Sequence, residues 1–225
     1  DYLEGDVLAY AHAAATTEDA DIVIGRYAHE MPDGSRTYVD SGQIYQPLDC
    51  QTVMTRWLTG YYTPPCAVLW RSGHIRDLGG WDESLKKNQD GDMVYRSLTH
   101  GPRLALSAGG CSIYSQGDAP TRISRQQTPG TLESQFTVLE KLRCTLAELP
   151  FDPSRELARS YYELARLAFS HGITEIGHRA ENRARGLGLK GQHGSVTHRL
   201  LASVFGLAGK QHLVRRARHY MGKSL

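Results

Sequence analysis

The spacing of hydrophobic positions changes several times along the start of the chain. Between residues 3 and 18, apolar side chains recur every three or four positions, which predicts a helix over that range. Residues 21–27 form a short run rich in β-branched side chains, and residues 36–39 form another after a Met-Pro-Asp-Gly-Ser turn. Both runs are expected to be strands.

The middle of the chain predicts helices and strands in alternation. Residues 66–70 contain no charged side chain and follow Pro64-Pro65, so they are expected to form a buried strand. Glycines mark where two of the helices should end, at Gly79-Gly80 and at Gly101. The helices are expected over residues 48–60, 72–78 and 88–100, and the further strands over residues 103–107 and 110–115.

After Pro120 the pattern is helical to the end of the chain. Amphipathic spacing predicts the helices, and Pro150 with Pro153 marks a joint after the first of them. They are expected over residues 130–148, 153–170, 173–187, 194–206 and 210–221. The sequence therefore predicts a mixed α/β part over residues 1–125, followed by an all-α helical region over residues 126–225.

Composition supports a folded domain and excludes a membrane-spanning one. Hydrophobic residues make up 40% of the 225 residues and charged residues 22%, which is sufficient for a packed core. No apolar run approaches the roughly 20 residues that a membrane-spanning helix needs. The first ten residues lack the basic and apolar segments of a signal peptide, and they begin so abruptly that further sequence is expected upstream.

Charge is distributed unevenly along the chain. Residues 1–150 contain 13 Lys and Arg against 19 Asp and Glu, a net charge of −6, whereas residues 151–225 contain 13 against 5, a net charge of +8. The basic segment could bind an anionic partner. Alternatively, it packs against the acidic part or forms a solvated helix face, and the sequence leaves these possibilities open.

Common metal, nucleophile and phosphate motifs are absent from the sequence. The four cysteines are widely spaced with no C-x-x-C pair, which is typical of reduced thiols in a cytosolic protein rather than of a zinc site or a disulfide framework. No H-E-x-x-H, G-x-S-x-G or G-x-x-x-x-G-K-S/T motif occurs. No nucleic-acid reader motif accompanies the basic segment, so nucleic acid is not an expected partner.

The most informative stretch runs from the strand at residues 66–70 to the helix at residues 88–100. An apolar strand, a Gly-Gly-aromatic-acid segment and an acidic helix start follow one another there. This order resembles the C-terminal half of the catalytic domain in family 2 glycosyltransferases, which have the GT-A fold. The positions that carry the resemblance are Gly79, Gly80, Trp81, Asp82, Glu83, Gln89, Asp90 and Arg96.

The resemblance assigns chemical roles to several of these residues. It implies an inverting transferase that moves a sugar from a nucleotide-diphosphate sugar to an acceptor hydroxyl. Inversion needs a base that removes the hydroxyl proton, and Asp90 matches the position of that base. The acceptor is expected to bind around it, at Gln89, Trp81, Asp82 and Glu83.

Structural roles stay open for the same residues. Asp90 could instead cap its helix, and Trp81 could be a core aromatic beneath the loop. One acid of the Asp82-Glu83 pair could cap the next turn. Asp92 is expected to be a first-turn acid that the helix dipole favours. Arg96 is expected to form a buried or half-buried ion pair rather than to contact substrate.

The chain departs from the family pattern at three places. Gln89 replaces the usual Glu before the base, and it can hydrogen-bond a sugar but cannot act as a second acid. The family's His after the last strand is missing, so Gln116 or Asp118 would have to replace its contact, or that contact is absent. The resemblance also implies that the nucleotide-binding front half of the domain lies upstream. Asp1 is at most one remnant of its Asp-x-Asp metal motif.

The metal requirement follows from the resemblance as well. A divalent cation, Mg²⁺ or Mn²⁺, is expected in the full-length enzyme, because it would stabilise the leaving diphosphate. Asp1 is its candidate ligand in this chain. The chain by itself shows no complete set of oxygen ligands, and it is expected to be inactive alone.

The partners are expected to be a nucleotide-sugar donor and a glycan, lipid-linked or protein acceptor, in polysaccharide or glycoconjugate synthesis. Residues 210–225 are basic and amphipathic, so they are either a peripheral contact with an anionic membrane or a capping helix with a basic outer face. The expected location is cytoplasmic, with peripheral contact at the inner membrane face as an option. A competing hypothesis is a non-catalytic helical interaction module, in which residues 151–225 bind a partner and the α/β part is a degenerate transferase remnant.

Overall fold

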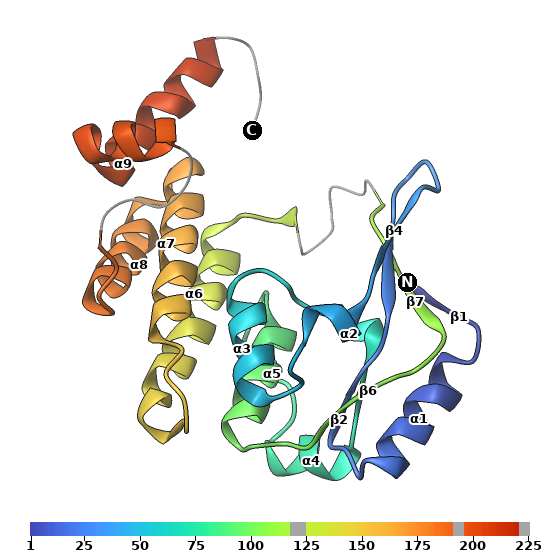
Figure 1. The fold of residues 1–225 in the computed structure, drawn as a ribbon. Coiled ribbons are helices and arrows are strands. Elements are labelled where there is room, and N and C mark those ends of the chain that lie inside the picture. Colours follow the sequence, from blue (N-terminus) through green and yellow to red (C-terminus); the bar gives the residue numbers. More distant parts are fainter. Residues whose placement is uncertain (118–124, 191–195, 221–225) are drawn as a thin grey trace. The chain divides into compact units, whose positions relative to one another are not determined.

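The computed structural model describes residues 1–117, 125–190 and 196–220. These residues form two compact units (Figure 1). The first unit is mixed α/β and the second is helical. Among the described residues, the first unit comprises residues 1–84, 89–117 and 148–151, and the second comprises residues 85–88, 125–147, 152–190 and 196–220. The boundary that the sequence predicts, after residue 125, stays a prediction.

Seven strands of the first unit form two sheets. One sheet has the order β1-β7-β3-β4 and the other has the order β5-β2-β6. β2 pairs in parallel with β6, and β3 pairs in parallel with β7, so two chain segments run side by side through both sheets. The strands are β1 (Tyr2–Glu4), β2 (Ile22–Ile24), β3 (Tyr27–Glu30), β4 (Arg36–Val39), β5 (Val68–Trp70), β6 (Leu104–Leu106) and β7 (Cys111–Ser115).

One helix prediction and two strand predictions need correction. The helix expected from residue 3 begins only with α1 (Val7–Thr17), because residues 2–4 pair with β7 as β1 and Gly5 then takes a φ of 68°. The strand expected over residues 21–27 divides into β2 and the start of β3. The strand expected to be buried is preceded by a 3₁₀ turn, Pro65–Ala67, and β5 is an edge strand whose side chains are half-buried.

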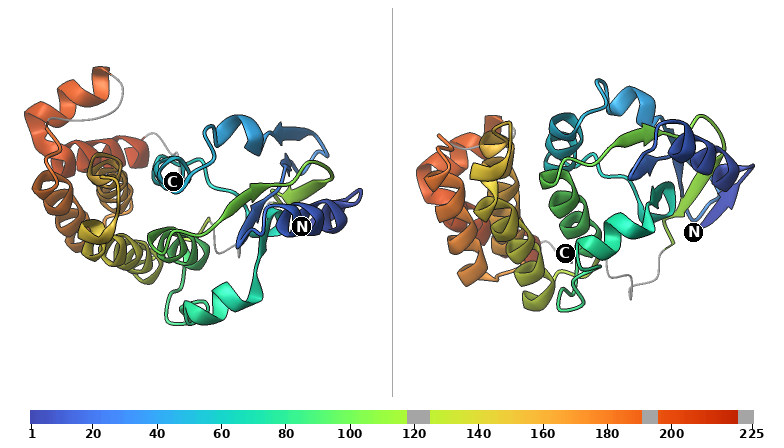
Figure 2. Two further views of the ribbon diagram at one scale, coloured as in Figure 1. Left: turned by 60° about the horizontal axis from the view of Figure 1, so that its bottom comes forward. Right: turned by 90° about the horizontal axis from the view of Figure 1, so that it is seen from below.

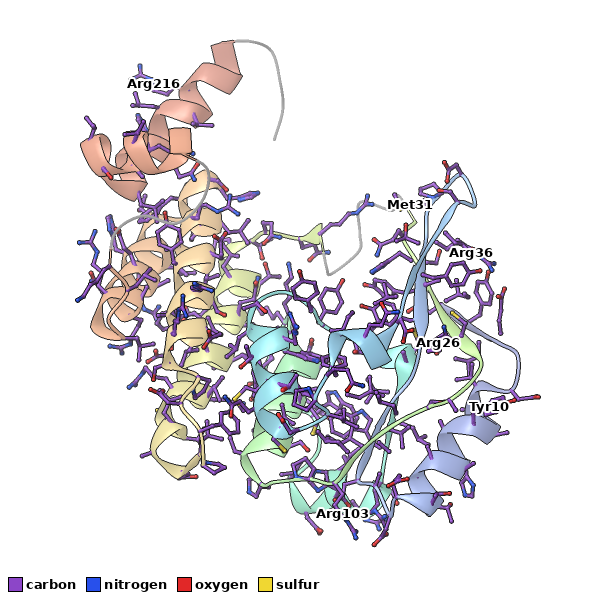
Figure 3. The ribbon with its side chains drawn as sticks, in the orientation of Figure 1. Tyr10, Arg26, Met31, Arg36, Arg103 and Arg216 are labelled. Atoms are coloured by element: carbon purple, nitrogen blue, oxygen red, sulfur yellow. The ribbon has the colours of Figure 1, made fainter. Side chains whose placement is uncertain are left out.

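Short polar networks hold the edges of the sheets. On β4, the Arg36 guanidinium donates to Glu30 of β3 and to Glu4 of β1, and it lies over the Tyr2 ring (Figure 3). These bonds tie three strands of one sheet together at its surface. Behind the other sheet, Ala11 of α1 packs against Val23 of β2 and Ala105 of β6.

Among the described residues, four further helices belong to the first unit, and three of them lie close to their predicted places. They are α2 (Ser41–Ile44), which the sequence did not predict, α3 (Cys50–Leu58), α4 (Ser72–Asp77) and α5 (Gln89–Thr99). Asp49 caps α3 by accepting a hydrogen bond from the Thr52 backbone N–H at 2.6 Å. Met93, Val94 and Leu98 form the buried face of α5.

Helices make up the second unit. They are α6 (Pro129–Cys144), α7 (Ser154–Ser170), α8 (Thr174–Gly186) and α9 (Val196–Tyr220), and a 3₁₀ turn at Leu146–Glu148 lies where the chain passes between the units. α6, α7 and α8 pack side by side (Figure 2). Gly206 interrupts α9 with a φ of 69° and a ψ of 167°, close to where the sequence predicts a break between two helices. No helix of the described residues is long and apolar enough to cross a membrane.

Candidate active site

The candidate site is built where the chain returns from α4 to the start of α5. α4 ends in two glycines with left-handed backbones, Gly79 with a φ of 80° and Gly80 with a φ of 75°. Their N–H groups donate to Arg76 and Ile75 carbonyls of α4, which satisfies the end of that helix. A side chain at either position would be strained, so the bend requires glycine.

Arg96 of α5 holds this bend in place. Its guanidinium donates to the Leu78 carbonyl at 2.7 Å, to the Gly80 carbonyl at 2.8 Å and to the Asp92 carboxylate at 2.8 Å. The Asp92 side chain is only 1% exposed, and that of Arg96 is 25% exposed. The expected ion pair of Arg96 is confirmed. Asp92, expected to be a first-turn acid, is the buried partner in that pair.

Trp81 follows the bend directly and contacts Asp90. The indole Nε1–H donates to Asp90 Oδ1 at 3.2 Å, and the Trp81 ring meets the Trp70 ring edge-on at 6.2 Å. Trp81 remains 40% exposed, and Asp90 is half-buried. Burial raises the pKa of the Asp90 carboxyl, and the indole hydrogen bond lowers it by less. The site thus holds a carboxylate that is partly desolvated, accessible and beside an exposed aromatic face.

The other predicted acceptor residues lie around the same loop. Asp82 Oδ1 accepts hydrogen bonds from the Ser84 backbone N–H at 2.9 Å and from the Ser84 hydroxyl at 2.6 Å, so Asp82 closes the next turn. Glu83 is exposed, and Gln89 is half-buried as the first residue of α5. Their binding of an acceptor stays a prediction.

The candidate metal ligand lies beside the end of β7. Asp1 Oδ1 accepts a hydrogen bond from the Ser115 backbone N–H at 3.1 Å. Within residues 1–117, 125–190 and 196–220, no group of three or more His, Cys, Asp and Glu side chains is arranged to hold a metal ion. One carboxylate is too few ligands for Mg²⁺ or Mn²⁺, so the described residues do not by themselves fit the expected cation.

Sequence reasoning missed a histidine near the same strand end. The Gln116 amide donates to His29 Nδ1 at 2.9 Å, which places the ring proton on Nε2. The rings of Tyr27 and Tyr114 meet His29 edge-on, at 5.4 and 5.7 Å. Burial lowers the pKa of His29, which favours the neutral ring. Only the strand register, His29 opposite Tyr114, brings these residues together. Asp118, the other expected substitute, lies outside the described residues.

Comparison with solved structures identifies the architecture. The crystal structure of S. aureus TarS 1–349 in complex with UDP-GlcNAc superimposes with a TM-score of 0.57 and 11% sequence identity, over 99% of this chain and 66% of that one. The chain has the GT-A fold. The predicted fold class is therefore confirmed, and this chain corresponds to about two thirds of the TarS structure.

Sequence comparison supports the same relationship over a short stretch. Two strains of Mycobacterium tuberculosis have a pre-mycofactocin glycosyltransferase that is 42% identical over 43 residues, which is 19% of this chain and 9% of that protein. No family model matches the chain. Together with the fold, the short match bears out the predicted resemblance to glycosyltransferases of family 2.

Proposed function

We propose that the full-length protein transfers a sugar from a nucleotide-diphosphate sugar to an acceptor hydroxyl with inversion, and that Asp90 is the base. The observation that carries this proposal is the contact between Asp90 and Trp81, at the first turn of α5. The carboxylate lies half-buried beside an exposed aromatic ring, as a base that must reach an acceptor hydroxyl requires.

The surroundings of Asp90 suit proton transfer. Partial burial favours the protonated carboxyl and so makes the carboxylate a stronger base than an exposed aspartate. The indole donor orients Oδ1, and among the described residues no hydrogen bond engages the other carboxylate oxygen, which would take the acceptor proton. Trp81 offers its exposed face to the hydrophobic side of a sugar ring. Gln89, Asp82 and Glu83 would supply hydrogen bonds to acceptor hydroxyls.

We propose the nucleotide-sugar donor from the comparison with TarS rather than from the geometry of the site. TarS was crystallised with UDP-GlcNAc, and its fold extends over nearly all of this chain, which supports a nucleotide sugar as the donor here. The expected divalent cation has one candidate ligand, Asp1, and no step of the mechanism is assigned to it. We therefore propose that the 225-residue chain alone does not transfer sugar.

A product analysis tests the proposal. The full-length protein is incubated with α-linked nucleotide sugars and candidate glycan acceptors, and proton NMR determines the anomeric configuration of the product. We expect a β-linked product from the full-length protein and none from the 225-residue chain. A product that retains the α configuration would rule out Asp90 as the base of an inverting transfer.

The end of the chain bears on the choice of acceptor. Within α9, Leu213 is 46% exposed and Arg216 is exposed (Figure 3). A lipid-linked acceptor would suit a helix that lies on an anionic membrane. Liposome flotation of the chain with and without residues 210–225 distinguishes a membrane-binding helix from a capping helix, since only the former gives flotation that depends on anionic lipid.

A further inference from the structure

Two adjacent tyrosines are exposed on the loop that follows α3. Tyr61 is 52% exposed and Tyr62 is 44% exposed. The Arg56 guanidinium lies over the Tyr61 ring, 5.6 Å from its centroid, and the Trp57 ring meets the Tyr62 ring edge-on at 6.4 Å. We call Arg56, Tyr61 and Tyr62 the aromatic shelf. It presents two ring faces and one positive charge.

Buried hydrogen bonds fix the backbone of the aromatic shelf. The Tyr45 hydroxyl donates to the Tyr61 carbonyl at 2.9 Å, and the Tyr27 hydroxyl donates to the Tyr62 carbonyl at 2.9 Å. Tyr45 is 1% exposed and Tyr27 is 5% exposed, and burial raises the pKa of both phenols, so both remain protonated donors. The Tyr45 hydroxyl also contacts Thr63 Oγ1 at 2.9 Å.

The two hydrogen bonds order the loop that carries the exposed rings. The hydroxyls of two buried tyrosines bind consecutive carbonyls of one exposed loop, so the backbone that carries the two rings is ordered before any ligand arrives. A site that is ordered in advance loses less conformational entropy on binding, and affinity rises accordingly.

The aromatic shelf lies toward the Asp90 end of α5. α3 and α5 pack together in opposite directions, because Cys50 at the start of α3 contacts the carbonyl of Pro102, just after α5 (Figure 1). Thr63, next to Tyr62, lines a small apolar cavity together with Val94, which is one helical turn after Asp90. The shelf and the candidate base therefore belong to the same end of the same helix pair.

We propose that the aromatic shelf binds a sugar ring that carries or adjoins a negative charge, such as a sugar phosphate. The apolar C–H face of a pyranose fits a tyrosine ring, and a phosphate or carboxylate fits the Arg56 guanidinium. Its role as a substrate subsite of the transferase rests on the proposed function. Binding of the sugar phosphate to the shelf can be measured without any transfer reaction.

Saturation-transfer NMR on the 225-residue chain tests the shelf, with glucose 1-phosphate, glucose and inorganic phosphate as probes. We expect the ring protons of glucose 1-phosphate to receive saturation. Replacing both tyrosines by alanine should weaken its binding by about tenfold or more, because the stacking surface is lost. Replacing both by phenylalanine should preserve binding, because the stacking surface remains.

The charge is tested separately. Arg56→Gln should reduce the affinity for glucose 1-phosphate to that for glucose, which has no phosphate. Tyr38→Ala is the matched control, since Tyr38 is 66% exposed on β4, outside the shelf. Circular dichroism confirms that each variant is folded. Unchanged binding by the double alanine variant, or inorganic phosphate that binds as tightly as glucose 1-phosphate, would overturn the proposal.

Failure of the shelf and failure of the proposed function give different results. Asp90→Asn should bind glucose 1-phosphate with unchanged affinity in the NMR experiment. If the full-length protein keeps its transfer activity with Asp90→Asn, the assigned base is wrong while the shelf stands on its NMR result. If Asp90→Asn abolishes transfer but the double alanine variant binds normally, only the shelf is wrong. The KM values of the full-length double alanine variant show which substrate the shelf binds. A higher KM for the donor indicates the donor sugar, and a higher KM for the acceptor indicates the acceptor sugar.

Discussion

The first turn of α5 carries two aspartates in contrasting surroundings. Asp92 is sealed from solvent, and the Arg96 guanidinium neutralises it. Asp90 is half-buried and accepts a hydrogen bond from a neutral indole, the one such bond within the part of the chain that the structure describes, and burial raises the pKa of its carboxyl. A fully paired buried charge serves the structure, whereas a partly desolvated charge without a cation is available for proton transfer. Two aspartates only two positions apart on one helix therefore differ in burial and in pairing, and the proposed function assigns proton transfer to Asp90 alone.

The largest effect should come from removing the charge at Asp90. Asp90→Asn keeps the size of the side chain and an oxygen for the Trp81 indole, but it cannot accept a proton. We expect transfer by the full-length protein to fall by about 10²- to 10⁴-fold. Steady-state kinetics measures the loss, and Asp77→Asn at the end of α4 serves as the control, with unchanged rates expected. A rate within about threefold of wild type would show that Asp90 is not the base.

Removing the cation beside Asp92 should affect stability. Arg96→Met removes the guanidinium from the sealed carboxylate together with the bonds to Leu78 and Gly80, so the free energy of unfolding should fall by about 3 kcal/mol. Urea unfolding of the 225-residue chain measures this.

Arg166→Met is the matched control, because the Glu163–Arg166 pair is exposed on both sides. An exposed pair should contribute less than about 1 kcal/mol. If the two variants lose the same stability, the buried pair has no special structural role.

Tyr45→Phe tests the other anchored loop. It removes the hydroxyl that bonds to Tyr61 and Thr63 while leaving the ring in place, so the chain should lose about 1–2 kcal/mol of stability. Binding of glucose 1-phosphate should weaken as well, although the aromatic shelf itself is unchanged. Thermal unfolding and NMR titration measure the two effects. Lost stability with unchanged binding would show that the anchoring does not serve the shelf.

Trp81→Phe should shift a pH profile. The indole hydrogen bond favours the Asp90 carboxylate, so its removal raises the pKa of Asp90 further. The base must be ionised, and transfer is therefore lost as the pH falls through that pKa. We expect the acid limb of kcat/KM in the Trp81→Phe variant to lie at higher pH than in wild type. A limb at lower pH would contradict the assigned hydrogen bond.

The smallest effect should be a gain in stability. A carboxyl whose pKa is raised by folding stabilises the folded state only at low pH, and that contribution is lost as the pH rises through the folded-state pKa. Asp90→Asn should therefore raise the midpoint of thermal unfolding at pH 7, and the advantage should disappear in acid. Calorimetry at several pH values measures this. Lower stability at pH 7 would indicate a structural carboxylate.

Local patterns predicted the elements that build the candidate site. The acidic start of α5, the glycine bend and the ion pair of Arg96 could all be expected from adjacent residues or from the resemblance. β1 could not, since residues 2–4 have helical spacing and become a strand only through pairing with β7. The sequence could not predict the burial of Asp92 either, because that burial depends on a loop that returns over α5.

The hydrogen bonds from Tyr27 and Tyr45 to the aromatic shelf could not be predicted from the sequence for the same reason. Tyr27 lies 35 residues before the carbonyl that it holds, and Tyr45 lies 16 residues before its own. No periodicity links a buried hydroxyl to a carbonyl in a distant loop. Such pairings depend on the packing of α3 against its neighbours, which single-sequence patterns do not describe.

The most direct test measures the ionisation of Asp90 itself. Carbon-13 NMR of the aspartate carboxyls in the 225-residue chain, assigned with Asp90→Asn, gives its pKa. The acid limb of kcat/KM for the full-length protein gives the pKa of the essential base. We expect the pKa of Asp90 from NMR and the pKa from the acid limb to agree, and both to lie above the pKa of an ordinary aspartate. An Asp90 that titrates like an exposed aspartate, or an acid limb that Asp90→Asn leaves in place, would contradict it.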